Sequence, residues 1–236
     1  ESFSLITSFV SDDYFGMMDS NEGTMANNDK LDIAVGRILV ENTQRAKEMV
    51  DKVESYYMPE TYGSWRNNFL LISDDVDKES DRIIQSTTEI IAEDVKAAKP
   101  FLNVQKIHAD SYVQETSSGG ARYSLVNKAI FDALEVGAIV VNYFGHGGED
   151  GLAGERIFDK INAQELNNPT KLNCFVTVTC EYTKFDNPFR ETAGEYLFWN
   201  KKGGAINLIT TTRKIYVNVG TSFNKTTQYS ENHYWI

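Results

Sequence analysis

One stretch of sequence decides both the fold and the chemistry that this chain suggests: Val140-Val141-Asn142-Tyr143-Phe144-Gly145-His146-Gly147. It is an apolar run, typical of a strand buried on both faces, and it stops at a single reactive side chain, His146. A second run, residues 174–179, stops in the same way at Cys180. Because an imidazole can take up the proton of a thiol, and because rigid strands fix the geometry of both groups, the pair predicts nucleophilic chemistry by a thiolate.

Working outward, apolar runs and amphipathic helices alternate along the chain. Buried-type strands are expected at residues 33–40, 69–72, 104–107, 138–144, 174–179 and 205–210. Apolar residues at helical spacing predict helices that begin at Asn42 or Thr43, that span 83–95 before Pro100, that span 125–134 before Gly137, and that lie near 191–199. Polar, Gly-rich residues predict loops at 11–28, 115–121 and 147–155. This alternation predicts an α/β fold, a mostly parallel sheet flanked by helices.

Three reactive groups follow predicted strands directly. They are His146, Cys180 and the turn Ser73-Asp74-Asp75. Open parallel sheets place their sites at the carboxyl ends of the strands, so these groups are expected at one edge. Asp75 is a candidate to orient His146 through the second ring nitrogen, by the logic of the third member of catalytic triads. The register of the turn leaves Asp74 as its alternative, and an ordinary Asx-type turn into a helix explains the same residues.

Composition excludes several classes of function. The 236 residues are 41% hydrophobic, enough for one substantial core, and the net charge of -11 disfavours nucleic acid as a partner. The sequence holds no long apolar span, so we expect no membrane insertion by this chain. The two cysteines, Cys174 and Cys180, would lie about 20 Å apart on one extended strand, too far for a disulfide. With three dispersed histidines they form no zinc ligand cluster, so no metal or cofactor is expected.

Several motifs together resemble the gingipain family of cysteine peptidases (family C25), in the clan that also includes caspases and legumains. The block that ends at His146 is similar to the gingipain histidine block. Ala34-Val35-Gly36-Arg37 before the helix at 43–57, and Trp65-Arg66-Asn67 before the strand at 69, also resemble gingipain sequence. One branch, the PorU-type sortases of the type IX secretion system, is most similar to the segments at 180–186, 203–205 and 210–213.

The resemblance implies a caspase-like fold, a Cys-His pair and a location at the bacterial cell surface, associated with the outer membrane. For the sortase branch it implies cleavage of C-terminal sorting domains from secreted cargo through an acyl-thioester, with transfer to a lipopolysaccharide amine. Cargo proteins and other outer-membrane subunits of the secretion system are the implied partners. Residues 1–236 would form a gingipain-like catalytic domain, a central portion of a longer chain that lacks the first core strand and the closing helices.

Each candidate residue has a role and a plainer alternative. Cys180 is the expected nucleophile, with a small buried hydrophobe as its alternative. His146 is the expected general base and acid, with a loop histidine hydrogen-bonded to the backbone as its alternative. Cys174 is expected to be a small buried hydrophobe. The amides of Gly147 and Cys180 are the expected oxyanion donors, since they lie beside the reacting groups. Asp81, in Glu79-Ser80-Asp81, resembles a gingipain residue that recognises a basic substrate side chain.

The recognition role of Asp81 has a structural alternative. Ser80 or Asp81 is equally suited to cap the following helix. Asp12, Asp13 and Asp19 lie in acidic loops that could bind calcium, but they lack the alternating ligand spacing of an EF-hand.

A second function of another class fits the same sequence: a non-catalytic gingipain-like surface module that binds partners through its acidic loops. Two further enzyme classes are disfavoured. There is no Gly-x-Ser-x-Gly elbow of a serine hydrolase, and neither a P-loop nor a Gly-x-Gly-x-x-Gly fingerprint of a nucleotide-binding protein.

Overall fold

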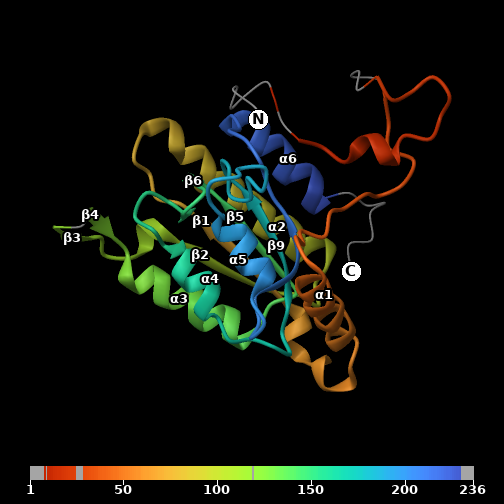
Figure 1. Ribbon diagram of the computed structural model, residues 1–236. Coiled ribbons are helices and arrows are strands. Elements are labelled where there is room, and N and C mark those ends of the chain that lie inside the picture. Colours follow the sequence, from red (N-terminus) through yellow and green to blue (C-terminus); the bar gives the residue numbers. More distant parts are fainter. Residues whose placement is uncertain (1–7, 9, 25–28, 119, 230–236) are drawn as a thin grey trace.

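A five-stranded parallel sheet forms the centre of the molecule (Figure 1), as the alternation of strands and helices predicts. The computed structural model describes residues 8, 10–24, 29–118 and 120–229. The strands follow the order β10-β9-β5-β1-β2 across the sheet. Their bounds are β1 (Asn68–Ser73), β2 (Asn103–His108), β5 (Val140–Phe144), β9 (Asn173–Val178) and β10 (Ala205–Ile209).

Helices cover both faces of this sheet (Figure 1), which explains why β1 and β5 are mostly apolar and buried along nearly their whole length. Val141 and Tyr143 of β5 pack into the core under α3 (Ser124–Val136), α4 (Lys160–Glu165) and α5 (Ala193–Trp199). The alternate residues Val140 and Phe144 belong to the core on the opposite face, which α2 (Arg82–Ala98) and α6 (Val217–Tyr229) cover. Helix α1 (Thr43–Tyr56) contributes Tyr56 to the rim of that second core.

Helix ends follow local chemistry. The side chain of Asn42 accepts a hydrogen bond from the amide of Arg45, which caps α1 as expected. Helix α3 ends at Gly137, whose φ of 100° lies in the left-handed region that favours glycine. Thr192 caps α5, and Glu195 completes a reciprocal capping box.

Helix α6 approaches the sheet closely at Gly220. A Cβ atom there would lie 2.9 Å from Cγ1 of Val178 and 3.1 Å from Cε2 of Phe144. The missing side chain therefore lets α6 lie against the carboxyl ends of β5 and β9. Among the described helices, none combines the length and the apolar character that crossing a bilayer requires.

Short hairpins replace two of the predicted loops. The segment 115–121 forms part of a hairpin of β3 (Glu115–Ser117) and β4 (Gly120–Arg122). The segment 147–155 contributes β6 (Gly147–Gly148) and β7 (Gly151–Leu152) to a small antiparallel sheet with β8 (Phe158–Asp159). Single turns of 3-10 helix complete the described structure: η1 (Asp13–Gly16), η2 (Pro59–Thr61), η3 (Ser64–Asn67), η4 (Glu79–Asp81) and η5 (Ala109–Ser111).

The expected strand at residues 33–40 is wrong. This segment is irregular and lies at the periphery in Figure 1, before α1, with Ile33 48% and Ile38 60% exposed. Within the described residues, this segment contacts loops and side chains and does not join a neighbouring strand. Arg37 pairs with Asp12, and the carbonyl of Leu39 accepts the indole N–H of Trp199. Because no neighbouring strand is available to form backbone hydrogen bonds with it, this apolar segment does not become a strand.

Candidate active site

The register of the sheet brings the two predicted reacting residues to one edge. Ser73, Phe144 and Val178 lie on the same rung of three neighbouring strands. The ladder continues one residue further, because the amide of Gly145 donates to the carbonyl of Val178 over 3.3 Å. His146 and Cys180 each lie two residues beyond that rung, on adjacent strands that are about 4.8 Å apart. Their backbones therefore leave the sheet side by side at its carboxyl edge.

The backbone of His146 is held at both of its polar groups. Its amide donates to Oδ2 of Asp74 over 2.7 Å. Its carbonyl accepts the hydroxyl of Tyr143 at 2.5 Å and the amide of Ala153 at 2.9 Å. The side chain, in contrast, is 48% exposed. A fixed backbone with an accessible ring is the arrangement that a general base requires.

Two predicted acids lie in different surroundings. Nε2 of His146 is 3.6 Å from Oδ1 of Asp81, whose side chain is only 4% exposed. Asp75 instead accepts the hydroxyl of Tyr123 at Oδ2, over 3.0 Å. In this structure the acid that faces the imidazole is therefore Asp81, and the expected orienting role of Asp75 stays a prediction.

Asp81 also shapes the turn before α2. It stands at the N-cap position of this helix, but its side chain forms no capping hydrogen bond with α2, so the capping role that its sequence allows is not seen. Its Oδ2 accepts the amide of Lys78 over 2.9 Å, and Oδ1 accepts the hydroxyl of Ser80 over 3.2 Å. These bonds fix the carboxylate at the rim where the imidazole lies.

The two cysteines differ in their surroundings. Both are free thiols. Cys180 is half-buried, with Sγ 3.8 Å from the carbonyl oxygen of Ile215, just before α6. Burial raises the pKa of Cys174 to about 11, so that thiol is unreactive near neutral pH. Only Cys180 thus combines a strand-end position at the His146 edge with partial access to solvent.

Backbone geometry around the thiol is unusual. Glu181, the residue after Cys180, has a φ of +52°, which non-glycine residues rarely adopt. Within the described part of the chain, no residue accepts a hydrogen bond from the amide of Cys180. Such a free amide suits the expected oxyanion role, which stays a prediction for Cys180 and for Gly147. Gly147 itself is confined, because a Cβ atom there would lie 2.7 Å from Oγ1 of Thr179.

A buried group of carboxylates lies behind the histidine. Asp74, Asp75 and Glu155 each place an oxygen within 4.8 Å of the others, close enough to share a cation. Burial, opposed by the hydrogen bond from His146 and reinforced by the charge of Asp75, raises the pKa of Asp74 to about 8. No sequence spacing predicts this group, since Glu155 comes from a distant loop. A second group, Asp19, Glu22 and Asp32, gathers largely exposed carboxylates in the N-terminal segment.

His108 forms a chain of hydrogen bonds that resembles a catalytic triad without being one. Its Nδ1 lies 2.6 Å from Oγ of Ser73, and its Nε2 lies 2.6 Å from Oε1 of Glu89. Ser73 is completely buried, so no substrate reaches its hydroxyl. The chain of hydrogen bonds links β1, β2 and α2, which is a structural role. His233 lies outside the described residues.

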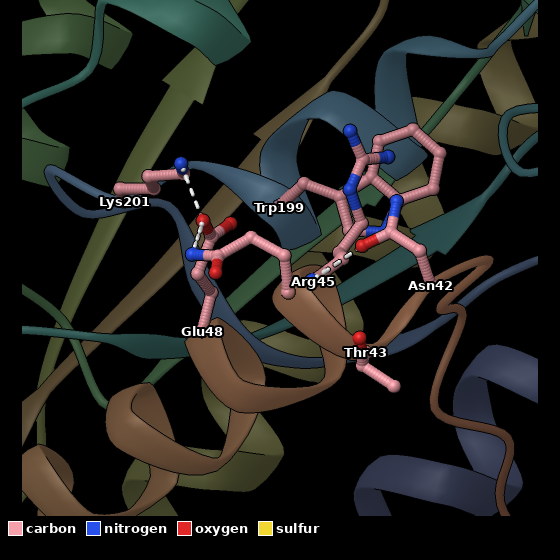
Figure 2. A pocket seen from close by; sticks show the side chains of 7 residues that line it. Asn42, Thr43, Arg45, Glu48, Trp199 and Lys201 are labelled. Carbon is pink, nitrogen blue, oxygen red and sulfur yellow. Dashed lines mark hydrogen bonds and ion pairs between the residues drawn. The ribbon is translucent and has the colours of Figure 1, made fainter.

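A cavity lined by neither Cys180 nor His146 lies elsewhere in the molecule. Figure 2 shows this cavity at the start of α1 and the end of α5, where the side chains of Arg45 and Trp199 lie against each other. Its volume is about 400 Å³, and the guanidinium carbon of Arg45 lies 3.9 Å from the centre of the Trp199 ring. Lys201 pairs with Glu48 at its rim over 2.6 Å. Helix α5 enters from the carboxyl edge of the sheet, so its end lies toward the amino edge, away from His146. Neither a cysteine nor a histidine lines this cavity, so the candidate active site stays at the carboxyl edge of the sheet.

Comparisons with solved structures identify the fold. The Arg-specific cysteine proteinase gingipain R matches with a TM-score of 0.69 and 20% identity, over 94% of this chain and 49% of that one. The complex of Porphyromonas gingivalis RgpB pro- and mature domains matches with a TM-score of 0.70 and 18% identity, over 93% of this chain and 49% of that one. A structure described as a protease matches with a TM-score of 0.57 and 19% identity, over 80% and 38%. The chain thus spans about half the length of these gingipain structures.

These matches confirm the caspase-like architecture, with a five-stranded parallel sheet flanked by helices. No curated protein sequence matches the chain. A sequence model of the family described as Peptidase family C25 matches residues 2–234, nearly the full length. The chain belongs to peptidase family C25, the gingipain family of cysteine peptidases.

Proposed function

We propose that this domain is a cysteine peptidase that uses Cys180 as nucleophile and His146 as general base and acid. One observation carries the proposal: the ladder that joins β5 and β9 aligns the two residues at the same edge of the sheet. The family supports the reaction class. Half-exposure of the imidazole gives a peptide access to the pair.

The reaction follows from these groups. His146 takes the proton of the Cys180 thiol, and the thiolate attacks the carbonyl carbon of the scissile bond. The amides of Gly147 and Cys180 donate to the resulting oxyanion. As the C–N bond breaks, His146 returns the proton to the leaving amine, which leaves an acyl-thioester on Cys180. Water or a second amine then attacks the thioester, losing a proton to His146, and the thiol is restored.

Asp81 is proposed to select a basic side chain before the scissile bond. Its buried carboxylate lies 3.6 Å from the imidazole, so a cation bound to it would lie beside the reacting carbonyl. Asp81→Asn should lower kcat/KM for substrates with Arg or Lys at this position far more than for substrates with Ala. An equal loss for both would instead assign Asp81 to the histidine.

For the biological role we propose a sortase of the PorU type, at the outer surface of the bacterial outer membrane. The resemblance of segments 180–186, 203–205 and 210–213 supports this assignment. Its substrates would be cargo proteins with C-terminal sorting domains, and its partners would be other subunits of the type IX secretion system. The thioester suits transfer to an amine of lipopolysaccharide, since an amine competes with water for the same carbonyl.

The test uses cargo with its sorting domain attached. Cys180→Ala and His146→Ala should each abolish cleavage while circular dichroism stays unchanged, and Cys174→Ala should retain it. A cleaved product joined to an added amine, seen by mass spectrometry, would demonstrate transpeptidation. Full cleavage by Cys180→Ala would refute the proposal.

A non-catalytic surface module is the second candidate. It is favoured by the exposed carboxylates of Asp19, Glu22 and Asp32 and by the net charge of -11. This alternative predicts that His146→Ala has no phenotype and that an acyl-reactive thiol probe does not label Cys180.

A further inference from the structure

We propose that Lys184 is a positioning residue that sets the distance between the Cys180 loop and the His146 loop, by bridging Glu149 and Glu181. The inference rests on the proposed function and adds a determinant of its geometry. The two reacting residues lie beyond the last rung of the sheet, so the ladder alone does not fix their side chains. Contacts between the loops must do so.

The first anchor belongs to the loop after His146. Glu149 lies at the turn between β6 and β7, three residues after His146. Its backbone carbonyl accepts the amide of Ala193 over 2.8 Å. Its Oε2 accepts Nδ2 of Asn187 over 2.9 Å and pairs with Nε of Arg190 over 3.2 Å. Glu149 is therefore already fixed against the segment that follows Cys180.

The second anchor is the residue next to the thiol. Nζ of Lys184 lies 3.1 Å from Oε1 of Glu181 and 3.4 Å from Oε1 of Glu149. One ammonium group thus joins the residue after Cys180 to the loop that carries His146. The three side chains are only 13–18% exposed, so water weakens these contacts less than it weakens an open surface pair.

The bridge also bears on a strained backbone position. Glu181 has a φ of +52°, a strained conformation for a residue other than glycine, which persists only where the surroundings hold it. Its amide donates to the carbonyl of Arg213 over 3.2 Å, which fixes one side of the residue. Lys184 holds its side chain on the other side. Release of the side chain would let the peptide that carries Cys180 relax.

The fold does not depend on this bridge. Arg213, in the segment between β10 and α6, forms a two-pronged ion pair with Asp186 of the loop that follows Cys180, over 2.8 and 2.6 Å. Arg190 pairs independently with Asp150. Loss of Lys184 should therefore shift the loop slightly and leave it folded. A shift of about 1 Å in a reacting group can lower a rate by about 100-fold, so a partial shift should cost about tenfold.

The experiment compares Lys184→Met with Lys128→Met in the 236-residue chain. Lys128 is the matched control, because it forms an exposed ion pair with Asp132 on α3. Lys184→Met should lower kcat for a chromogenic peptide about tenfold with KM within twofold. It should also slow the alkylation of Cys180 by iodoacetamide at neutral pH, because the imidazole would no longer be placed to take the proton of the thiol. Lys184→Arg should restore most of the activity, and Lys128→Met should change neither quantity.

Several results would overturn the inference. An unchanged kcat and alkylation profile in Lys184→Met would show that the bridge does not position the thiol. If Lys184→Arg lowers kcat and the melting temperature as much as Lys184→Met does, the role of Lys184 is purely structural. His146→Ala separates the two levels: if it leaves the alkylation of Cys180 unchanged, the proposed function fails together with the inference. If it slows alkylation while Lys184→Met does not, the inference alone fails.

Discussion

Replacement of Asp74 by Asn should make the protein less sensitive to rising pH. Burial raises the pKa of Asp74 from 3.8 to about 8, so the folded state retains a proton that the unfolded chain releases near pH 4. The stabilising contribution of this carboxyl is therefore fully present below about pH 4 and is lost as the pH rises through 8. Asn keeps an oxygen that accepts the amide of His146, and it removes the buried charge beside Asp75 and Glu155.

The magnitude follows from linkage. One proton bound only by the folded state gives a slope of about 1.4 kcal/mol per pH unit, so the wild type should lose about 3 kcal/mol more than Asp74→Asn between pH 5 and 7.5. Urea unfolding at these two pH values, followed by tryptophan fluorescence, measures the difference. If the free energy of unfolding changes between these pH values by the same amount in both proteins, within about 0.5 kcal/mol, the buried, protonated state of Asp74 is refuted.

Three other changes test different parts of the account. Ser73→Ala should leave the rate of peptide hydrolysis within twofold of wild type, because Ser73 is buried. It should lower the free energy of unfolding in urea by about 1 kcal/mol, because the hydrogen bond between Ser73 and His108 is lost. Loss of hydrolysis would point to a serine nucleophile. Gly145→Ala would place a Cβ atom 2.4 Å from Cβ of Asp74, so kcat and melting temperature should both fall, and an unchanged enzyme would contradict the described backbone. Burial lowers the pKa of Lys52 to about 7, so folded protein binds fewer protons than unfolded chain between pH 7 and 10 and gains stability across that window. Lys52→Met should remove this gain, as urea unfolding at pH 7 and 9.5 would show.

The central strands could be predicted because their residues are buried on both faces. In β5 and β9 a mostly apolar run indicates burial even where the elements that cover the strand are unknown. The pattern at residues 33–40 is equally apolar, yet Ile33 and Ile38 are exposed, because no neighbouring strand accepts their backbone. Helix α6 was not predicted, since Val, Thr, Asn and Gly are weak helix formers and packing against the sheet at Gly220 supports it.

The candidate site likewise has features that could be predicted from the sequence and features that could not. Parallel topology brings His146 and Cys180 to one edge of the sheet, so that shared edge could be predicted from the order of the strands, and their pairing in catalysis stays a prediction. The acid that faces the imidazole depends on side chains from other elements. Tyr123, at the start of α3, engages Asp75, while the turn before α2 directs Asp81 toward the ring. Bridges such as that of Lys184 join loops far apart in sequence, and no local pattern reports them.

Capture of the acyl-enzyme tests the central claim most directly. The protein would be mixed with an activated phenyl ester, quenched in acid within the burst phase, digested and analysed by mass spectrometry. The account predicts one acyl group on Cys180, formed at least tenfold more slowly in His146→Ala and absent from Cys180→Ala. An adduct on Cys174 instead, or labelling of Cys180 at the same rate without His146, would contradict it.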